Sequence, residues 1–383
     1  MIALKQNPMY RFLLVMTISS TVGLQAWMML FNNFAVEQVN LTGEQVGMIQ
    51  SVREIPGFLT FLAVFVMMVI KEHRLSAISI LFLGAGLALT GFFPTYAGLM
   101  VTTVVMSFGF HYYETTNQSL TLQYFDRYTS PMVFGKLRSI AAASNIGIGV
   151  LIFLISSFLD FKSIYLAIGG LVMAAGMWAF TRNPVNKDIV PQHKRMIFRK
   201  KYWLYYFLTF MAGARRQIFM AFAVLLLVRK FGFTVQEVTA LFVVNNLINY
   251  FLSPMVGRCI IRFGERKVLS LEYFSLIFIF LAYAVVDSKI LVSLLYILDH
   301  IFFNFAIAIR TYFQKIGDPK DIAPSMAVGF TINHIAAVFL PALGGILWMV
   351  DYRIPFVAGA GLSLISLMAV QKIRVPEKIV AST

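Results

Sequence analysis

Residues 211–220 read MAGARRQIFM, and they place two adjacent arginines, Arg215 and Arg216, near the middle of an apolar run from Tyr202 to Val228. That run has about the length that a helix needs to cross a bilayer. Two cations at that depth are costly unless a buried partner, a water-filled cavity or an anionic ligand compensates their charge. The stretch therefore predicts a membrane helix that carries an anion-binding or coupling site.

The composition indicates an integral membrane protein. Hydrophobic residues make up 59% of the chain, charged residues only 13%, and the mean hydropathy is +0.78. The net charge of +15 lies in short clusters between apolar runs, which is typical of topology signals facing an anionic leaflet. We therefore expect no nucleic-acid partner. We expect the lipid bilayer, protons and a small solute to be the partners of a single, monomeric chain.

Several kinds of chemistry are excluded by the motifs. The single cysteine, Cys259, allows neither an internal disulfide nor a cysteine-based metal cluster. The sequence has no phosphate-binding loop, no zinc-protease motif and no nucleophile elbow. We therefore expect a protein that is not an enzyme, that has no cofactor and no metal, and that ATP does not drive directly.

Apolar runs bounded by charged or turn residues predict an all-α protein with twelve transmembrane helices. They cover residues 10–34, 43–70, 75–93, 96–124, 134–159, 163–181, 202–229, 235–262, 267–286, 289–315, 323–350 and 354–372. The long polar and basic segment 182–201 separates the sixth helix from the seventh. We therefore expect an N-terminal six-helix bundle over 1–181, a linker over 182–201 and a C-terminal six-helix bundle over 202–383.

The distribution of Lys and Arg predicts the orientation. With the N-terminus inside, the outside loops hold only five of the 32 basic residues, namely Lys162, Arg229, Lys230, Lys289 and Arg353. Basic residues favour the cytoplasmic side of a membrane. We therefore expect a multi-pass protein of the cytoplasmic (inner) membrane with both termini and the linker in the cytoplasm.

The two halves resemble each other at an offset of about 192 residues. Residues 41–46, LTGEQV, correspond to 233–238, FTVQEV, and the segment 160–162, DFK, corresponds to 351–353, DYR. Two such repeats in the same orientation are related by a pseudo-two-fold axis along the membrane normal. Their interface is where a substrate path lies in transporters of this kind.

Residues 257–267, GRCIIRFGERK, resemble the cytoplasmic loop signature of the major facilitator superfamily, Gly-x-x-x-Asp-Arg-x-Gly-Arg-Arg. The matching positions, expected to form a gating loop, are Gly257, Arg262, Gly264 and Arg266. Ile261 stands in place of the signature's Asp, so the charge relay of the gate is weaker or built differently. The resemblance implies two pseudo-symmetric six-helix bundles and secondary active transport by alternating access.

The helix over 96–124 carries candidate proton-coupling groups. His111, Glu114 and Gln118 have the spacing i, i+3 and i+7, which places them on one helix face. A carboxyl and an imidazole inside a membrane are the groups that proton coupling requires. The alternative is a structural hydrogen-bond network between helices. The other polar residues include Asn245, Asn246, Asn249 and the Asn333-His334 pair, and asparagines more often hold membrane helices together than bind a ligand.

Two pairs of adjacent charged residues, Arg53-Glu54 and Arg215-Arg216, pose a geometric question. Adjacent helical residues point about 100° apart, so only one of each pair is expected to face a cavity squarely. The other would pack into its own bundle or form an ion pair with a neighbouring helix. For the second pair, the alternative to a ligand is a buried ion pair with Asp299 or Glu114.

A guanidinium is a rigid fork that suits carboxylate or phosphate groups, so we expect a small anionic or zwitterionic substrate. The expected substrate-binding residues are Arg215, Arg216, Arg53, Gln25, Trp27, Gln217, Tyr113 and Asn304. The expected proton-coupling residues are Glu114, His111, Asp299 and Glu54. Two alternatives stay open: a proton-driven exporter of lipophilic or cationic compounds, and a transporter-like lipid-handling or scaffold protein.

Overall fold

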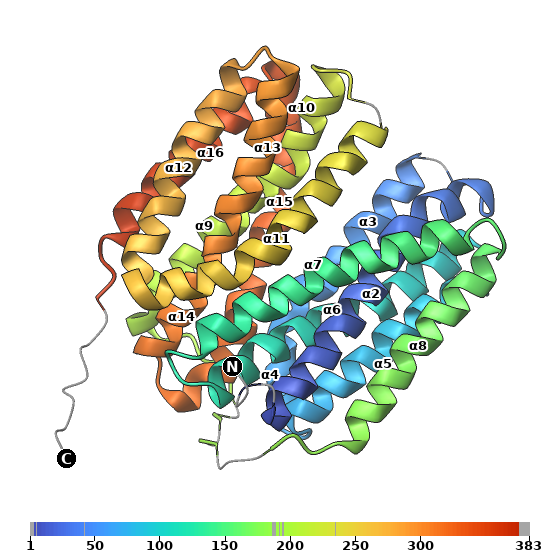
Figure 1. The fold of residues 1–383 in the computed structure, drawn as a ribbon, viewed down its shortest axis with the longest axis horizontal. Helices are drawn as coiled ribbons and strands as arrows, with labels where there is room; N and C mark the ends of the chain where they lie inside the picture. Colours follow the sequence, from blue (N-terminus) through green and yellow to red (C-terminus); the bar gives the residue numbers. More distant parts are fainter. Residues whose placement is uncertain are drawn as a thin grey trace.

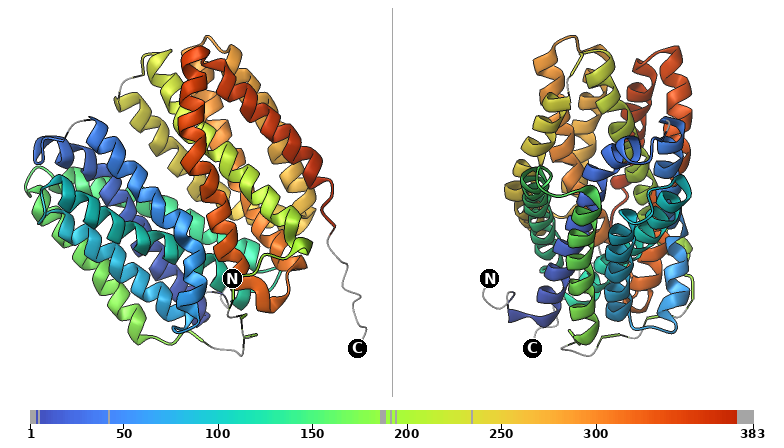
Figure 2. Two further views of the ribbon diagram at one scale, coloured as in Figure 1. Left: turned by 180° about the vertical axis from the view of Figure 1, so that it is seen from behind. Right: turned by 90° about the vertical axis from the view of Figure 1, so that its right-hand side faces the viewer.

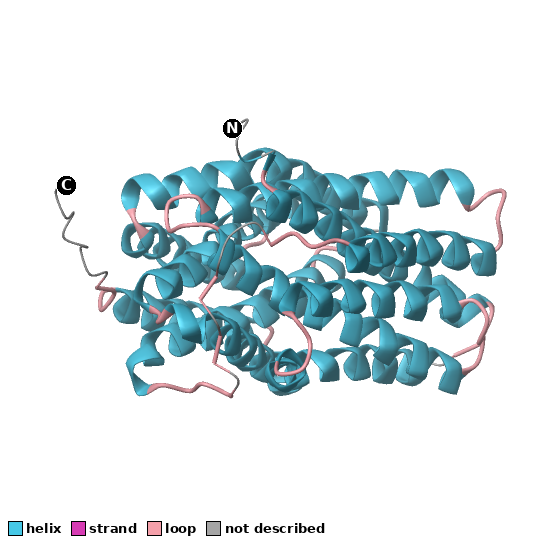
Figure 3. Cartoon of the chain, turned by 90° about the horizontal axis from the view of Figure 1, so that it is seen from below, coloured by secondary structure: helices cyan, strands magenta, loops and turns pink. Residues whose placement is uncertain are grey.

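The computed structural model describes residues 4, 6–41, 43–185, 189–190, 192–193, 195–233 and 235–374. In this part of the chain the regular structure is helical and contains no strand (Figure 3). The helices lie in two groups, one from each half of the sequence (Figure 1). The all-α class is confirmed.

The first group contains six helical segments. They are α2 (Pro8–Glu37), α3 (Gly43–Phe58) continued by η1 (Leu59–Leu62) and α4 (Ala63–Met67), α5 (Glu72–Thr90), α6 (Tyr96–Tyr124), α7 (Ser130–Ile155) and α8 (Phe161–Thr181). The expected helix over 43–70 is therefore a broken one. Pro56 lies inside α3 and removes one backbone donor, so the segment continues as a tighter turn.

The second group repeats this pattern. It begins with η2 (Lys200–Tyr202), α9 (Trp203–Ile218), η3 (Phe219–Ala223) and α10 (Val224–Arg229). It continues with α11 (Val235–Phe263), α12 (Glu265–Val285), α13 (Lys289–Phe303), η4 (Asn304–Ala306) and α14 (Ile307–Ile316). It ends with η5 (Pro319–Asp321), α15 (Ile322–Val350) and α16 (Arg353–Val370). The expected helices over 202–229 and 289–315 are thus also interrupted.

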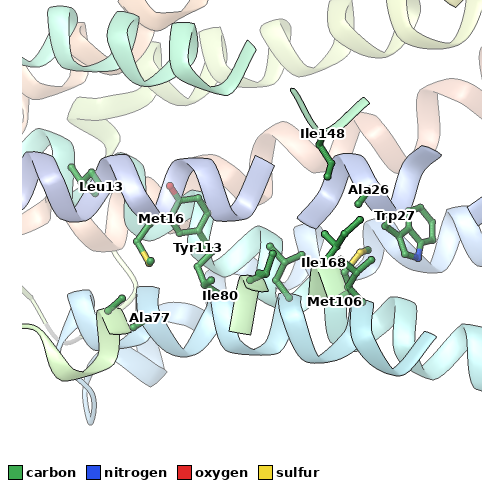
Figure 4. Close-up of a cluster of buried hydrophobic side chains, with 14 of the residues drawn as sticks. Leu13, Met16, Ala26, Trp27, Ala77, Ile80, Met106, Tyr113, Ile148 and Ile168 are labelled. Carbon is green, nitrogen blue, oxygen red and sulfur yellow. The ribbon is translucent and has the colours of Figure 1, made fainter. Parts of the chain in front are cut away.

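Among the described residues, ten helices are long and apolar enough to cross a membrane by length and composition. The two long helices outside that set are α6 and α15, which carry His111, Glu114 and His334. Each half has its own apolar core. Figure 4 shows part of the first, where Trp27, Met106, Tyr113 and Ile168 are buried. The boundaries at 181 and 202 stay a prediction.

Small residues allow close helix packing inside the first group. A Cβ added at Gly84 of α5 would lie 2.7 Å from the backbone nitrogen of Met173 in α8. One added at Gly86, also in α5, would lie 2.5 Å from the backbone nitrogen of Met106 in α6. Close backbone approach of this kind is how helices associate where lipid supplies no hydrophobic driving force.

The two groups meet where α7 crosses α11, toward the end of the molecule that carries the linker (Figures 1 and 2). A Cβ added at Gly257 would lie 2.5 Å from the carbonyl oxygen of Pro131. Near this crossing, Ser130 donates to Gln314 Oε1 at 2.5 Å, and Gln314 Nε2 donates to the Leu122 carbonyl at 2.8 Å. These contacts join the bundles at the linker end. Farther from it, Asn145 Nδ2 of α7 donates to Asn246 Oδ1 of α11 at 3.1 Å, and the Phe61 N–H of η1 donates to Thr331 Oγ1 of α15 at 2.9 Å.

Asp321 holds the linker to the second bundle. Its side chain is fully buried and accepts hydrogen bonds from Tyr202 at 2.6 Å and Arg199 at 3.0 Å, and it pairs with His193 Nδ1 at 2.7 Å. Burial alone would raise the pKa of this carboxyl. The hydrogen bonds from Tyr202, Arg199 and His193 outweigh that effect and hold the pKa below its ordinary value.

We predict that Asp321→Asn lowers stability by about 2 kcal/mol, because charge-assisted hydrogen bonds to a buried carboxylate are lost. Thermal unfolding of the purified protein in detergent measures this change. Since the folded pKa is lowered, the stabilisation is complete above the ordinary value of 3.8 and is lost as the pH falls through the lower folded value. The difference between variant and wild type should therefore shrink at acidic pH.

The matched control is Asp287→Asn. Asp287 pairs with Lys230 at 2.8 Å, but its side chain is 86% exposed, so its removal should change stability little. Equal losses in the two variants would contradict the assignment of Asp321 as the linker anchor.

Candidate functional site

The adjacent arginines of α9 have different environments. Arg215 is 1% exposed, and its Nη1 donates to the hydroxyl of Ser366 in α16. Its Nη2 lies 3.8 Å from Glu272 Oε1 of α12, and its guanidinium lies 4.3 Å from the centre of the Tyr273 ring. Asp299 of α13 is also within its electrostatic reach. Arg215 is therefore held inside the second bundle, away from the first.

Arg216 is solvent-exposed at the same depth of the fold. Its charge acts on Glu54 and His111 of the first bundle and on His334 and Arg310 of the second. An exposed guanidinium with groups of both bundles around it requires a solvent-accessible space between them. Of the two arginines, Arg216 is the one that faces this space.

Three of the helices around Arg216 are interrupted near it. The π-helical turn η3 begins three residues after Arg216, and the Phe219 N–H is shared between the carbonyls of Arg215 and Arg216. In the first half, η1 follows Pro56, and in the second, η4 begins at Asn304. Irregular backbone at membrane depth is tolerated where it is buried in protein or lines a cavity. Broken helices of this kind mark binding sites in transporters.

Arg53 and Glu54 pair with each other, although they are adjacent. Arg53 Nη2 lies 2.7 Å from Glu54 Oε1, and the two side chains are 21% and 29% exposed. Arg53 also lies 5.5 Å above the ring of Trp27, which is fully buried. The two side chains thus form an ion pair with each other, and that only one of them faces a cavity squarely stays a prediction.

Beside Glu54, two imidazoles from different bundles meet. His334 Nε2 of α15 lies 3.9 Å from Glu54 Oε2, and the His334 and His111 ring centres are 4.9 Å apart. Gly57 makes room for both rings, since a Cβ there would lie 2.5 Å from His334 Cδ2 and 3.0 Å from His111 Cε1. Glu54, His111 and His334 place their ligand atoms within 4.8 Å of one another.

Glu114 forms a second charged cluster in α6. It is half-buried, and Gln118 Nε2 donates to its Oε1 at 3.0 Å. Its charge acts on Arg138 of α7 and on Arg310 of α14. Glu114 and Gln118 therefore lie on one face of α6, as their spacing in the sequence indicates. His111 of the same helix is packed against His334 instead of Glu114.

The other expected site residues lie inside the bundles or are partly exposed. Tyr113 is buried, and its hydroxyl lies 2.9 Å from that of Thr17. Asn304 is buried and donates to Asn249 Oδ1 at 2.5 Å. Asp299 is buried, and its carboxylate oxygens have no hydrogen-bond partner among the described residues. Gln25 and Gln217 are both half-buried.

The loop that carries the family signature joins α11 to α12. Gly264 has a φ of +79°, a conformation that favours glycine. Arg266 donates to Gln371 Oε1 at 3.1 Å, and Arg262 lies 5.3 Å from the centre of the Phe263 ring. Glu265, directly before Arg266, is buried and pairs with Lys315 of α14 at 2.7 Å.

Two residues of this region were not predicted as site residues. Arg138 is a basic residue of α7, and His334 follows Asn333 in α15. Only the three-dimensional arrangement brings Arg138 to Glu114 and His334 to Glu54.

The comparisons with known proteins agree with this architecture. The family model described as Major Facilitator Superfamily matches residues 205–381. No curated protein matches the sequence. Three solved structures similar to this one cover nearly the whole chain.

A human protein described as the organic anion transporter MFSD10 (TETRAN) has a TM-score of 0.79, 10% sequence identity, and coverage of 95% of this chain and 99% of its own. The transporter FucP in the outward conformation has a TM-score of 0.77, 13% identity, and coverage of 96% and 99%. A bacterial homologue of the iron transporter ferroportin, in an outward-facing state, has a TM-score of 0.77, 12% identity, and coverage of 95% and 98%.

At these identities the structural likeness establishes the fold alone, while the family model matches the second half by sequence. Together with the signature loop from Gly257 to Lys267, these findings show that the second half of this multi-pass membrane protein matches the major facilitator superfamily by sequence, and that the whole chain has the fold of the transporters named above.

Proposed function

We propose that the protein is a secondary active transporter that moves a small anionic or zwitterionic solute by alternating access and couples this movement to protons. The observation that carries the proposal is the arrangement of charges around Arg216. Four guanidinium groups lie in one electrostatic network with two carboxylates; they are Arg53, Arg138, Arg216 and Arg310, with Glu54 and Glu114.

With neutral histidines, four positive and two negative charges leave this network with a net charge of +2. An uncompensated positive charge of this size at membrane depth is costly, and an anionic ligand would reduce the cost. Arg53 and Glu54 already neutralise each other at 2.7 Å. Arg216 is therefore the group best placed to bind the anionic part of a substrate, because it is exposed and no ion pair within 4 Å is found for it among the described residues.

The joints between the bundles support an outward-open conformation. The contacts of Ser130 with Gln314 and of Gly257 with Pro131 lie toward the linker end. If basic residues place the linker in the cytoplasm of a cell with an inner membrane, the space at Arg216 opens to the opposite side. FucP and the ferroportin homologue are described in outward states, and FucP is also described as a fucose:proton symporter.

Proton coupling is proposed for Glu114 and Glu54, which are both partly buried in the network. Protonation of either carboxylate would raise the positive charge around Arg216, and substrate binding would lower it. Substrate and proton would thus favour each other's binding, as linkage requires. Asp299 and Glu272 lie in the separate, buried environment of Arg215 inside the second bundle.

We predict that Arg216→Gln weakens the binding of anionic metabolites by roughly 10- to 100-fold, because one charge-assisted hydrogen bond is lost. A thermal-shift screen of the purified protein against a panel of carboxylates, phosphates, cationic amines and neutral sugars measures it, since a ligand that binds only the folded state raises the melting temperature. Melting of the ligand-free variant should be close to that of wild type.

The matched control is Arg215→Gln. This change leaves Glu272 without its cation inside the bundle, so it should lower the melting temperature strongly, by an equivalent of about 3–5 kcal/mol. If cationic amines bind preferentially, and with the same affinity to Arg216→Gln as to wild type, the anion proposal is wrong and the exporter of cationic compounds is favoured.

We also predict that Glu114→Gln abolishes uphill transport driven by a pH gradient, while exchange of labelled for unlabelled substrate continues. The amide keeps the size and the hydrogen bond with Gln118 but cannot titrate. Transport into proteoliposomes by the best ligand of the screen measures both modes. Glu37→Gln, at an exposed helix end, is the control, and gradient-driven uptake that persists in Glu114→Gln would exclude this carboxyl.

A further inference from the structure

We infer that Glu54, His111 and His334 form a binding site for a divalent first-row transition-metal ion that bridges the two bundles. This inference does not rest on the proposed anion site. Two of the ligands come from the first bundle, through α3 and α6, and the third comes from α15 of the second. Their ligand atoms all lie within 4.8 Å of one another.

The hydrogen bonds around His334 fix which ring nitrogen can bind an ion. His334 Nδ1 lies 2.9 Å from the carbonyl oxygen of Phe330, and a carbonyl can only accept, so Nδ1 carries the proton. The lone pair is therefore on Nε2, which faces Glu54 Oε2 at 3.9 Å. Metal-binding histidines have this arrangement, in which the second ring nitrogen donates to a backbone carbonyl.

With a neutral His334 and an ionised Glu54, two acceptors face each other here. His111 adds a third group, whose Nδ1 is buried and has no hydrogen-bond partner among the described residues. A shared cation would compensate the repulsion between such acceptors. Imidazole and carboxylate together suit ions such as Zn²⁺, Fe²⁺ or Mn²⁺.

The distances are close to those of a bound ion. With bonds of about 2.0–2.2 Å and tetrahedral angles, two ligand atoms of a zinc ion lie about 3.4 Å apart. Glu54 and His334, at 3.9 Å, would have to approach each other by about 0.5 Å, and the most distant pair, within 4.8 Å, by up to about 1.4 Å. Gly57 leaves the two rings the space that this approach requires.

The neighbouring arginines oppose a cation, because the charges of Arg53 and Arg216 act on Glu54 and His111. Arg53 binds Glu54 through Oε1, so Oε2 stays available for an ion. An ion would therefore have to be held by the coordination of the three ligands and not by the net charge of the surroundings. Because the ligands belong to both bundles, a bound ion would hold α3 and α6 against α15 and oppose their separation.

The test uses the purified full-length protein, stripped of metal with a chelator and titrated with Co²⁺, whose visible absorption reports imidazole and carboxylate ligands. Zn²⁺ competition then gives its affinity. We expect one ion per chain and a rise in melting temperature. Each of the variants His111→Ala, His334→Ala and Glu54→Gln should weaken binding by at least about tenfold.

Two further variants keep the result interpretable. His300→Ala removes a nearby imidazole outside the cluster, one bonded to Asn249, and should leave the affinity unchanged. Gly57→Ala keeps all three ligands but forces the His334 ring aside, so it should weaken binding even if a ligand variant fails to fold. Absence of Co²⁺ binding, or equal affinity in the ligand variants and His300→Ala, would overturn the inference and leave a proton as the only shared cation.

Discussion

The cost of a charge in a low-dielectric interior controls how this molecule is built. A guanidinium at membrane depth can be compensated by buried acid groups or by exposure to solvent. Arg215 is surrounded by buried groups, namely Glu272 at 3.8 Å, Ser366 and the Tyr273 ring. Arg216 is exposed to solvent, and its exposure defines the space between the bundles. Two neighbouring residues of one helix thus serve the interior of a bundle and the interface between bundles.

Much of the fold was predictable because it depends on signals that lie close together in the sequence. The apolar runs gave helix ranges that agree with the structure to within a few residues, and the loop from Gly257 to Lys267 pointed to the family. Interruptions within helices were not predicted. They depend on local strain and packing, as at Pro56, where the chain continues through a tighter turn that the hydropathy pattern does not reveal.

The candidate site was predictable only in part. Sequence spacing placed Glu114 and Gln118 on one face, and depth in an apolar run singled out Arg215 and Arg216. Which arginine faces the interface depends on the rotation of α9 about its axis, and no local pattern sets this. The pairing of Glu54 with His334 depends on how α3 of one bundle meets α15 of the other, so residues far apart in the sequence had to be placed in space first.

The crossing of α7 and α11 has a mechanical consequence. At Gly257 and Gly135 the backbones approach with no side chain between them, whereas farther along the two helices Ser139 donates to the Tyr250 carbonyl and Asn145 Nδ2 donates to Asn246 Oδ1 at 3.1 Å. A rotation of one bundle against the other would therefore have to break hydrogen bonds along this whole contact, in addition to those of Gln314 with Ser130 and Leu122. Those bonds belong to the energy difference between two orientations of the bundles, and they contribute little to the stability of either bundle by itself.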